Sequence, residues 1–190
     1  MKPHHLIFEG AELAGKSWLM SQIYNYLEPK YNKTGYLLDG CYWFNCDVGI
    51  YGTKHGKPVI ESYLKIFTEL KNSNLLVEKF YLSDLIYNLL HRGKKVNYKT
   101  IEQQLKKLGF KIILITFPPN KKLIQSRIAD RLKLYPHYRR ILRKPEWYIE
   151  QQKEYLKEIK KNSLPYLIIE TKKLPDNNLN NKILKWINEI

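Results

Sequence analysis

The chain has 190 residues, of which 27% are charged and 44% hydrophobic, as in an ordinary globular protein with one well-buried core. No stretch is apolar over the ~20 residues that a membrane-spanning helix needs. The apolar part of the opening MKPHHLIFEG is also too short for a signal peptide. We therefore expect one domain over residues 1–190, a cytoplasmic location and no membrane partner.

The formal net charge is +15. Such an excess favours anionic partners, either nucleotides or nucleic acid. The lysines are scattered along the chain, however, which is as typical of a biased coding composition as of a binding face. Nucleic acid therefore stays open as a partner without being favoured. Cys41 and Cys46 are the only cysteines, and without a second pair at metal-ligand spacing we expect two reduced thiols rather than a zinc site.

Hydrophobic periodicity divides the chain into alternating strands and helices. In chain order, strands are expected at residues 5–9, 35–40, 74–80, 111–117 and 164–171, and helices at 16–27, 59–72, 83–93, 98–109, 121–134, 145–161 and 181–190. Pro29 should stop the first helix, while Ser83 caps and Gly93 closes the third. The segment from Cys41 to Pro58 has no periodicity and is more typical of a functional loop than of a simple connection. Strands that alternate with helices imply a parallel sheet covered on both faces.

The segment GAELAGKS, from Gly10 to Ser17, has the spacing G-x-x-x-x-G-K-[ST] of a P-loop between an expected strand and helix. Its glycines let backbone N–H groups converge on phosphate oxygens at a helix N-terminus, where the dipole favours negative charge. We expect Lys16 to be exposed and to reach the β- and γ-phosphates, and the Ser17 hydroxyl to ligate Mg²⁺. The predicted ATP-binding residues are Gly10, Ala11, Glu12, Leu13, Ala14, Gly15, Lys16, Ser17 and Trp18.

Three segments resemble those of known nucleotide kinases. FEGAELAGKS is similar to the opening of thymidylate kinases, FEG-x-D-x-x-GKS, with Glu12 in place of the aspartate. EKFYLSD has the spacing of the deoxynucleoside kinase segment ERS-x-x-SD, which it matches at Glu78, Ser83 and Asp84. Lys79 replaces the arginine expected after the acid, so the positive charge is kept but the bidentate fork is lost.

A third segment, LIQSRIADR, resembles the lid of both families, in which two arginines four apart close on the phosphates; here these are Arg127 and Arg131. Trp18 stands where the family usually has threonine. The arginine-containing segment that thymidylate kinases carry after their second strand has no counterpart, so the resemblance leaves the substrate open. It implies a three-layer α/β P-loop NTPase fold of the nucleoside monophosphate kinase type, with a five-stranded parallel sheet and a helical lid at about residues 121–145.

The resemblance also implies transfer of the γ-phosphoryl group of ATP, with Mg²⁺, to a (deoxy)nucleoside monophosphate, thymidylate first among them. The alternatives are a deoxynucleoside kinase, a polynucleotide 5′-hydroxyl kinase, and a non-catalytic nucleotide-dependent nucleic-acid binder. The main partner is then a small-molecule nucleotide, and a homodimer stays open. Expected catalytic residues are Lys16, Glu12, Glu78, Arg127 and Arg131; expected metal ligands are Ser17 and Glu78; expected acceptor-binding residues are Lys79, Ser83, Tyr42 and Trp43.

Several of these residues also have a purely structural interpretation. Glu12 could be a solvated loop carboxylate, and the two arginines a solvated pair on one helix face. Tyr42 and Trp43 could be core aromatics beside a strand as readily as groups that stack a base. Glu78 ends a buried strand, where an unpaired carboxylate is costly, so a partner cation or metal is favoured.

Overall fold

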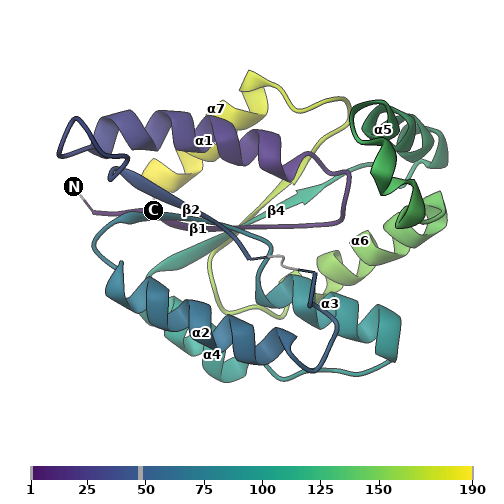
Figure 1. The fold of residues 1–190 in the computed structure, drawn as a ribbon, viewed down its shortest axis with the longest axis horizontal. Coiled ribbons are helices and arrows are strands. Elements are labelled where there is room, and N and C mark those ends of the chain that lie inside the picture. The colour runs from purple at the N-terminus through teal and green to yellow at the C-terminus, as the bar shows by residue number, and fades with distance from the viewer. Residues whose placement is uncertain (1, 47–48, 190) are drawn as a thin grey trace.

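The computed structural model of the chain describes residues 2–46 and 49–189. A parallel sheet of five strands, in the order β2-β3-β1-β4-β5, forms its middle layer (Figure 1). The strands are β1 (His5–Glu9), β2 (Cys41–Asn45), β3 (Asn74–Glu78), β4 (Phe110–Thr116) and β5 (Tyr166–Glu170). All four neighbouring pairs are parallel, which confirms the predicted sheet.

Helices cover both faces of this sheet (Figure 1). They are α1 (Lys16–Tyr31), α2 (Gly56–Glu69), α3 (Tyr81–Arg92), α4 (Lys99–Lys107), α5 (Lys121–Leu134), α6 (Pro145–Ile159) and α7 (Asn177–Glu189), with a short 3-10 helix, η1 (Pro136–Arg140), after α5. Helices α1 and α7 lie over one face, and α2, α3 and α4 over the other. Among the described residues, no helix is both long and apolar enough to span a bilayer.

Strand β1 shows how the two layers are held. Leu6 and Phe8 are buried toward α1 and α7, while Ile7, between them, is buried toward α2, α3 and α4. Successive side chains of a strand point to opposite faces, so a strand that is covered on both sides must be apolar throughout. The continuous apolar runs of β1 and β4 have this cause.

The predicted strand at residues 35–40 is wrong. Leu37 and Leu38 are exposed in a turn region, and the strand is instead β2, which starts at Cys41 and pairs with β3. The Cys41 N–H donates to the Glu28 carboxylate, and the Asn74 side chain donates to the carbonyl of Gly40. These buried contacts fix where the strand begins, and an apolar pattern does not reveal them.

The region predicted as one long loop from Cys41 to Pro58 is therefore a strand, a connection and the start of α2. Asp47 and Val48 in this region lie outside the described residues. The connection is held by Asp84, whose Oδ1 accepts the Gly52 N–H at 2.8 Å. Within α2, Gly56 packs so closely that a β-carbon there would lie 1.9 Å from the same oxygen.

Two helix ends also differ from the prediction. Helix α1 continues past Pro29 to Tyr31, since proline this close to a C-terminus removes only one helical N–H, and the Asn32 N–H closes the helix on Glu28 O at 2.9 Å. Ser83 is the third residue of α3 and not its cap. Gly93 does close α3, with φ 60, as predicted.

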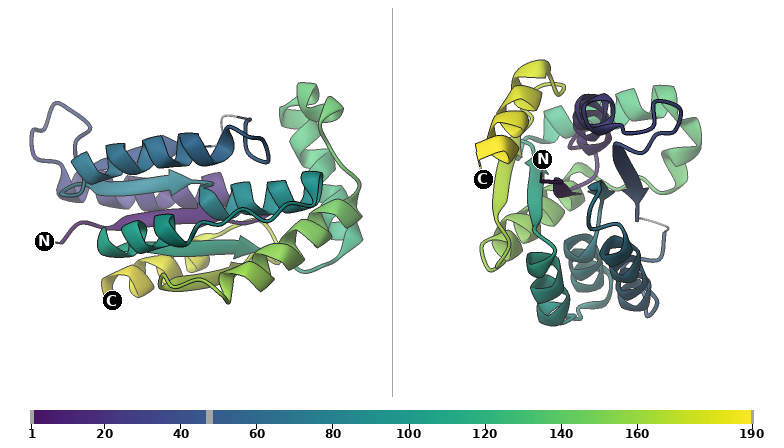
Figure 2. Two further views of the ribbon diagram at one scale, coloured as in Figure 1. Left: turned by 90° about the horizontal axis from the view of Figure 1, so that it is seen from below. Right: turned by 90° about the vertical axis from the view of Figure 1, so that its left-hand side faces the viewer.

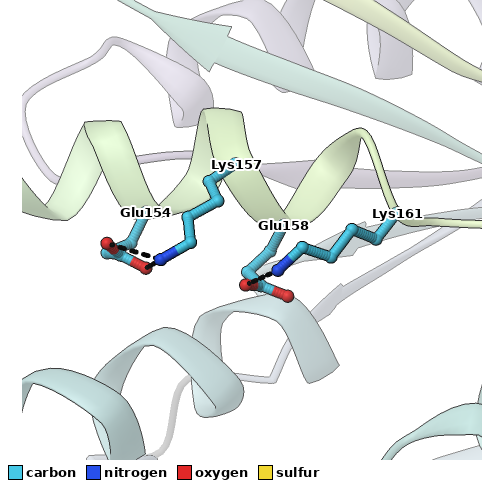
Figure 3. A network of polar contacts seen from close by, with 4 residues as sticks. All are labelled: Glu154, Lys157, Glu158 and Lys161. Atoms are coloured by element: carbon cyan, nitrogen blue, oxygen red, sulfur yellow. Dashed lines mark hydrogen bonds and ion pairs between the residues drawn. The ribbon is translucent and has the colours of Figure 1, made fainter.

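Two ion pairs along α6 and just past its end account for part of the lysine content. Glu154 pairs with Lys157 at 3.2 Å, and Glu158 with Lys161 at 2.6 Å (Figure 3). Pairs of this i,i+3 kind on an exposed helix stabilise it by only about 0.2–0.5 kcal/mol. The two lysines are about half exposed and bind glutamates that are mostly buried.

The carboxyl ends of the strands meet at one edge of the sheet, which is where open α/β sheets bind their ligands. The loop after β1 and the end of β3 lie at this edge. Helices α5 and η1 stand across it (Figure 2, left). The fold therefore brings the three segments that resemble known kinases to one place.

Candidate active site

The P-loop has the backbone conformation that its glycines allow. Gly10 has φ 132 and Gly15 has φ 88, a region that L side chains rarely adopt, and Leu13 between them has φ 66. A β-carbon on Gly10 would lie 2.1 Å from Ile115 O, so the loop also passes too close to β4 for any side chain there. Helix α1 begins directly after the loop at Lys16. This strand–loop–helix geometry directs N–H groups at the helix N-terminus toward a shared anion position.

Lys16 is buried, and the expectation that it is exposed is wrong. Its ammonium donates to the carbonyls of Gly10 at 2.9 Å and Ala11 at 2.8 Å, because a buried charge needs hydrogen-bond partners and the loop itself supplies them. Burial, together with the nearby charge of Lys79, lowers the pKa of Lys16 to about 8. The ammonium is therefore held against the backbone of the loop that contains it.

Ser17 and Glu78 meet across the site. The Ser17 hydroxyl donates to Glu78 Oε1 at 2.6 Å. Hydroxyl and carboxylate oxygens are the ligands that Mg²⁺ prefers, and this ion is usually held by one or two protein oxygens together with substrate phosphates and water. Among residues 2–46 and 49–189, no cluster of three or more His, Cys, Asp or Glu could hold a metal alone. The pair fits a Mg²⁺ that arrives with a nucleotide.

A cavity of about 410 Å³ opens over the P-loop. Its walls carry three cations, Lys16, Lys79 and Arg131, and two carboxylates, Glu12 and Glu78. The remaining lining residues are Leu13, Gly15, Ser17, Trp18, Asn45, Gly49, Tyr138 and Ile141. Most of the predicted P-loop and strand-three residues thus surround one space.

A second cavity, of about 640 Å³, adjoins the first and shares the P-loop and Trp18 with it. On its far side it is bounded by α5, by Tyr135 and Tyr138, and by Leu174 and Pro175 from the connection between β5 and α7. Its walls are more apolar and aromatic than those of the first cavity. Such a surface suits a planar, uncharged group next to the anion site.

The two lid arginines are in different environments. The guanidinium of Arg131 lies over the Tyr138 ring, 4.2 Å from its centroid, and lines both cavities. Arg127 is buried and donates four hydrogen bonds to the protein, the first to Leu13 O at 2.9 Å. The alternative of a solvated pair on one helix face is therefore corrected: Arg131 lines both cavities, whereas Arg127 lines only the second and has its guanidinium bound by the protein.

Lys79 holds the turn between β3 and α3. Its φ is 54, its N–H donates to Phe8 O at 3.0 Å, and its carbonyl accepts from the Tyr51 hydroxyl at 3.3 Å. A non-glycine residue in this region is strained, so the neighbouring contacts must hold it there. The result is a lysine at the carboxyl end of β3 on the cavity wall.

Three of the residues predicted to bind the acceptor lie away from the two cavities. The Ser83 hydroxyl is fully buried between the Glu9 carboxylate, at 2.5 Å, and the Tyr155 hydroxyl, at 2.8 Å. Tyr42 and Trp43 lie within β2, where Tyr42 packs on the core and Trp43 lies beside Tyr24. In the described part of the chain, none of these three lines either cavity above the P-loop. The direction of each of these side chains is set by the element that carries it, β2 for Tyr42 and Trp43 and the first turn of α3 for Ser83.

Some important residues were not identified from the sequence. Glu9 ends β1, and its Oε1 accepts the N–H groups of Phe80, Leu82 and Ser83, so it caps α3 from a neighbouring strand. Burial raises the pKa of Glu9, and these hydrogen bonds oppose the rise. Only one sign of this role is visible in the sequence, a carboxylate directly before the P-loop. The sequence could not show the hydrogen-bond partners of Glu9, which lie more than 70 residues away.

A second such residue is Tyr87 of α3, whose hydroxyl donates to Glu12 Oε1 at 2.6 Å. The contact holds the Glu12 carboxylate at the cavity wall, which corrects the interpretation of Glu12 as a freely solvated loop carboxylate. Lys79 Nζ lies 5.8 Å from the centroid of the same Tyr87 ring. Tyr87 thus lies against both Glu12 and Lys79, which line the first cavity.

No family model and no curated protein matches the chain. Solved structures do, and the fold is that of the P-loop nucleotide and nucleoside kinases. The YorR protein from Bacillus subtilis, in complex with phosphorylated GDP, is 14% identical with TM-score 0.69, over 96% of this chain and 95% of that one. Thymidylate kinase from Ehrlichia chaffeensis is 12% identical with TM-score 0.59, over 99% and 100%. Deoxyadenosine kinase from M. mycoides, with dCMP and a flexible dCDP bound, is 17% identical with TM-score 0.58, over 98% and 100%.

Proposed function

We propose that the chain is a nucleotide kinase that transfers the γ-phosphoryl group of Mg²⁺–ATP to a (deoxy)nucleoside monophosphate. One observation carries the proposal: the Ser17–Glu78 pair, a fit for Mg²⁺, lies in the same cavity as Lys16, Lys79 and Arg131. Phosphoryl transfer needs positioning and charge neutralisation more than covalent chemistry by the protein. A cavity with a metal position and three cations supplies both.

The donor half of the site follows from the P-loop. Its N–H groups and Lys16 would hold the β- and γ-phosphates, and Ser17 and Glu78 would hold the Mg²⁺ that bridges them. The base of ATP would enter the second cavity beside Trp18 and Pro175. When bound, the metal would offset charge on the phosphate oxygens.

The acceptor half is assigned to the part of the wall formed by Lys79 and by Glu12, whose carboxylate Tyr87 holds. A phosphate oxygen of the acceptor attacks the γ-phosphorus while the bond to the β–γ bridging oxygen breaks, so that ADP leaves with the electron pair. Lys79 would hold the acceptor's phosphate, and Arg131 would neutralise charge on the transferring group. Thymidylate is the acceptor we expect first, because the opening segment resembles thymidylate kinases, and the shared fold supports the kinase class.

The test is a coupled ADP-release assay with Mg²⁺–ATP and a panel of acceptors. The panel contains the four deoxynucleoside monophosphates, their nucleosides and a 5′-hydroxyl oligonucleotide. A monophosphate should accelerate ADP release most, and Lys16→Ala, as the matched inactive variant, should abolish the signal. Preference for a nucleoside would favour a deoxynucleoside kinase, and preference for the oligonucleotide a polynucleotide kinase. No acceleration by any member would reject the kinase proposal for these acceptors.

A further inference from the structure

Arg127 lies beside the P-loop, where it lines the second cavity while the protein binds its guanidinium. Its Nη1 donates to Leu13 O at 2.9 Å and to Thr171 Oγ1 at 3.1 Å, and its Nη2 to the carbonyls of Thr171 at 2.5 Å and Lys173 at 2.7 Å. The guanidinium also lies 5.6 Å from the centroid of the Phe117 ring. These four acceptors are neutral, and Arg127 is only 8% exposed. The buried guanidinium therefore binds neutral acceptors, three of which are backbone carbonyls.

Thr171 extends this contact to the next peptide of the loop. It is fully buried directly after β5, and its hydroxyl lies 3.0 Å from Ala14 O and 2.9 Å from Thr116 O. The Thr116 carbonyl already accepts the Thr171 N–H at 2.8 Å, so the single hydroxyl proton is best used on Ala14. Arg127 and Thr171 therefore hold two successive P-loop carbonyls.

Peptide planarity turns this into an argument about phosphate binding. In a trans peptide the C=O of one residue and the N–H of the next point in opposite directions. With the carbonyls of Leu13 and Ala14 turned toward Arg127 and Thr171, the N–H groups of Ala14 and Gly15 point away from them. N–H groups at this place in a P-loop are those that bind phosphate.

We infer that Arg127 and Thr171 are positioning residues that preset the P-loop for nucleotide phosphates. The inference rests on the nucleotide site of the proposed function but not on phosphoryl transfer. If the N–H groups are already in place, the loop loses less conformational entropy when phosphate binds. A charged donor on Leu13 O also polarises that peptide, so the N–H of Ala14 becomes a stronger donor. Arg127 acts here through the backbone and not as a ligand of the transferring phosphate.

The experiment measures the binding of ADP, tripolyphosphate and adenosine by titration calorimetry to the wild type, Arg127→Lys, Thr171→Val and Thr171→Ser. Arg127→Lys keeps the charge but loses the fork, and Thr171→Val keeps the shape but loses the hydroxyl. Both should raise the Kd of ADP and of tripolyphosphate about tenfold. Thr171 lines neither cavity, so Thr171→Val should leave the Kd of adenosine unchanged, and Thr171→Ser should keep wild-type values. Arg140→Gln is the matched control, an exposed arginine of the lid segment outside the cavity walls, and should change nothing.

Each alternative gives a different result. Unchanged Kd for tripolyphosphate in folded Arg127→Lys and Thr171→Val would overturn the inference, and so would equal weakening of adenosine and tripolyphosphate binding by Thr171→Val. A lower kcat at unchanged Kd would instead make Arg127 a direct partner of the transferring phosphate. If Arg127→Lys fails to fold, the near-isosteric Thr171→Val decides alone. Because these measurements need no acceptor, weakened phosphate binding together with an inactive acceptor panel would reject the proposed function and leave this inference standing.

Discussion

The Ser17 hydroxyl lies 2.6 Å from Glu78 Oε1, although 61 residues separate the two in the chain. The register of the sheet brings them together: Phe8 of β1 lies beside Glu78 of β3, and the P-loop that follows β1 turns back over that strand end. A slip of one residue would point Glu78 to the opposite face. The proposed metal position thus depends on the pairing of two buried strands.

Replacing Glu78 with glutamine should separate metal use from nucleotide binding. Loss of the carboxylate charge should raise the Mg²⁺ concentration needed for half-maximal activity at least tenfold and lower kcat on the order of 10²-fold. The affinity for ADP without Mg²⁺ should stay the same. Rates measured against Mg²⁺ concentration check this, with Glu61→Gln on the exposed side of α2 as the control. Unchanged Mg²⁺ dependence would remove Glu78 from the metal site.

The buried position of Lys16 predicts a pH dependence of nucleotide binding. Its pKa of about 8 in the free protein means that the ammonium is progressively lost above that pH. A bound phosphate favours the ammonium and raises this pKa, so ADP binding should take up a proton and weaken by up to about tenfold per pH unit above pH 8. Calorimetry in two buffers of different ionisation enthalpy measures the uptake.

The neighbouring Lys79 supplies the control for this experiment. Its charge is the largest cause after burial of the low Lys16 pKa, so Lys79→Met should move the onset of weakening to higher pH. The phosphates of ADP have finished titrating by then, since their pKa lies near 6. An ADP affinity that stays flat between pH 7 and 10 in the wild type would contradict the burial argument.

Lys79 and Arg131 should respond differently to substitution. Lys79→Ala should raise the KM for the acceptor tenfold or more with little change in the KM for ATP, because its proposed partner is the acceptor's phosphate. Arg131→Ala should mainly lower kcat, by about 10²-fold, because its proposed partner is charge that develops during transfer. Steady-state kinetics with both substrates varied tests the pair. Equal effects of Lys79→Ala on both KM values would remove its acceptor-specific role.

Local patterns predicted the parts of this site that depend on neighbours in the sequence. The P-loop, four of the five strands and the span of α5 follow from glycine spacing and apolar periodicity. The start of β2 does not, because it depends on Glu28 and Asn74, whose partners lie far along the chain. The same limit applies to Ser83, which the kinase-like spacing placed near the acceptor although the hydroxyl faces Glu9. Hydrogen bonds between residues far apart in the chain cannot be predicted from the local pattern of a single sequence.

Glu9→Gln should lower the free energy of unfolding by about 2 kcal/mol, the scale of hydrogen bonds to a buried charged group. Oε1 of the carboxylate accepts three N–H groups at the start of α3, and Oε2 accepts the Ser83 hydroxyl. In glutamine one of these oxygens becomes an NH₂ group, which would face donors and lose their hydrogen bonds. Urea unfolding at pH 7 measures the change, with exposed Glu170→Gln expected within about 0.5 kcal/mol of the wild type. Burial raises the pKa of Glu9, whereas the helix N-terminus and the hydrogen bonds favour its charge. Equal stability of Glu9→Gln and the wild type would show that burial wins and that Glu9 is protonated in the native state.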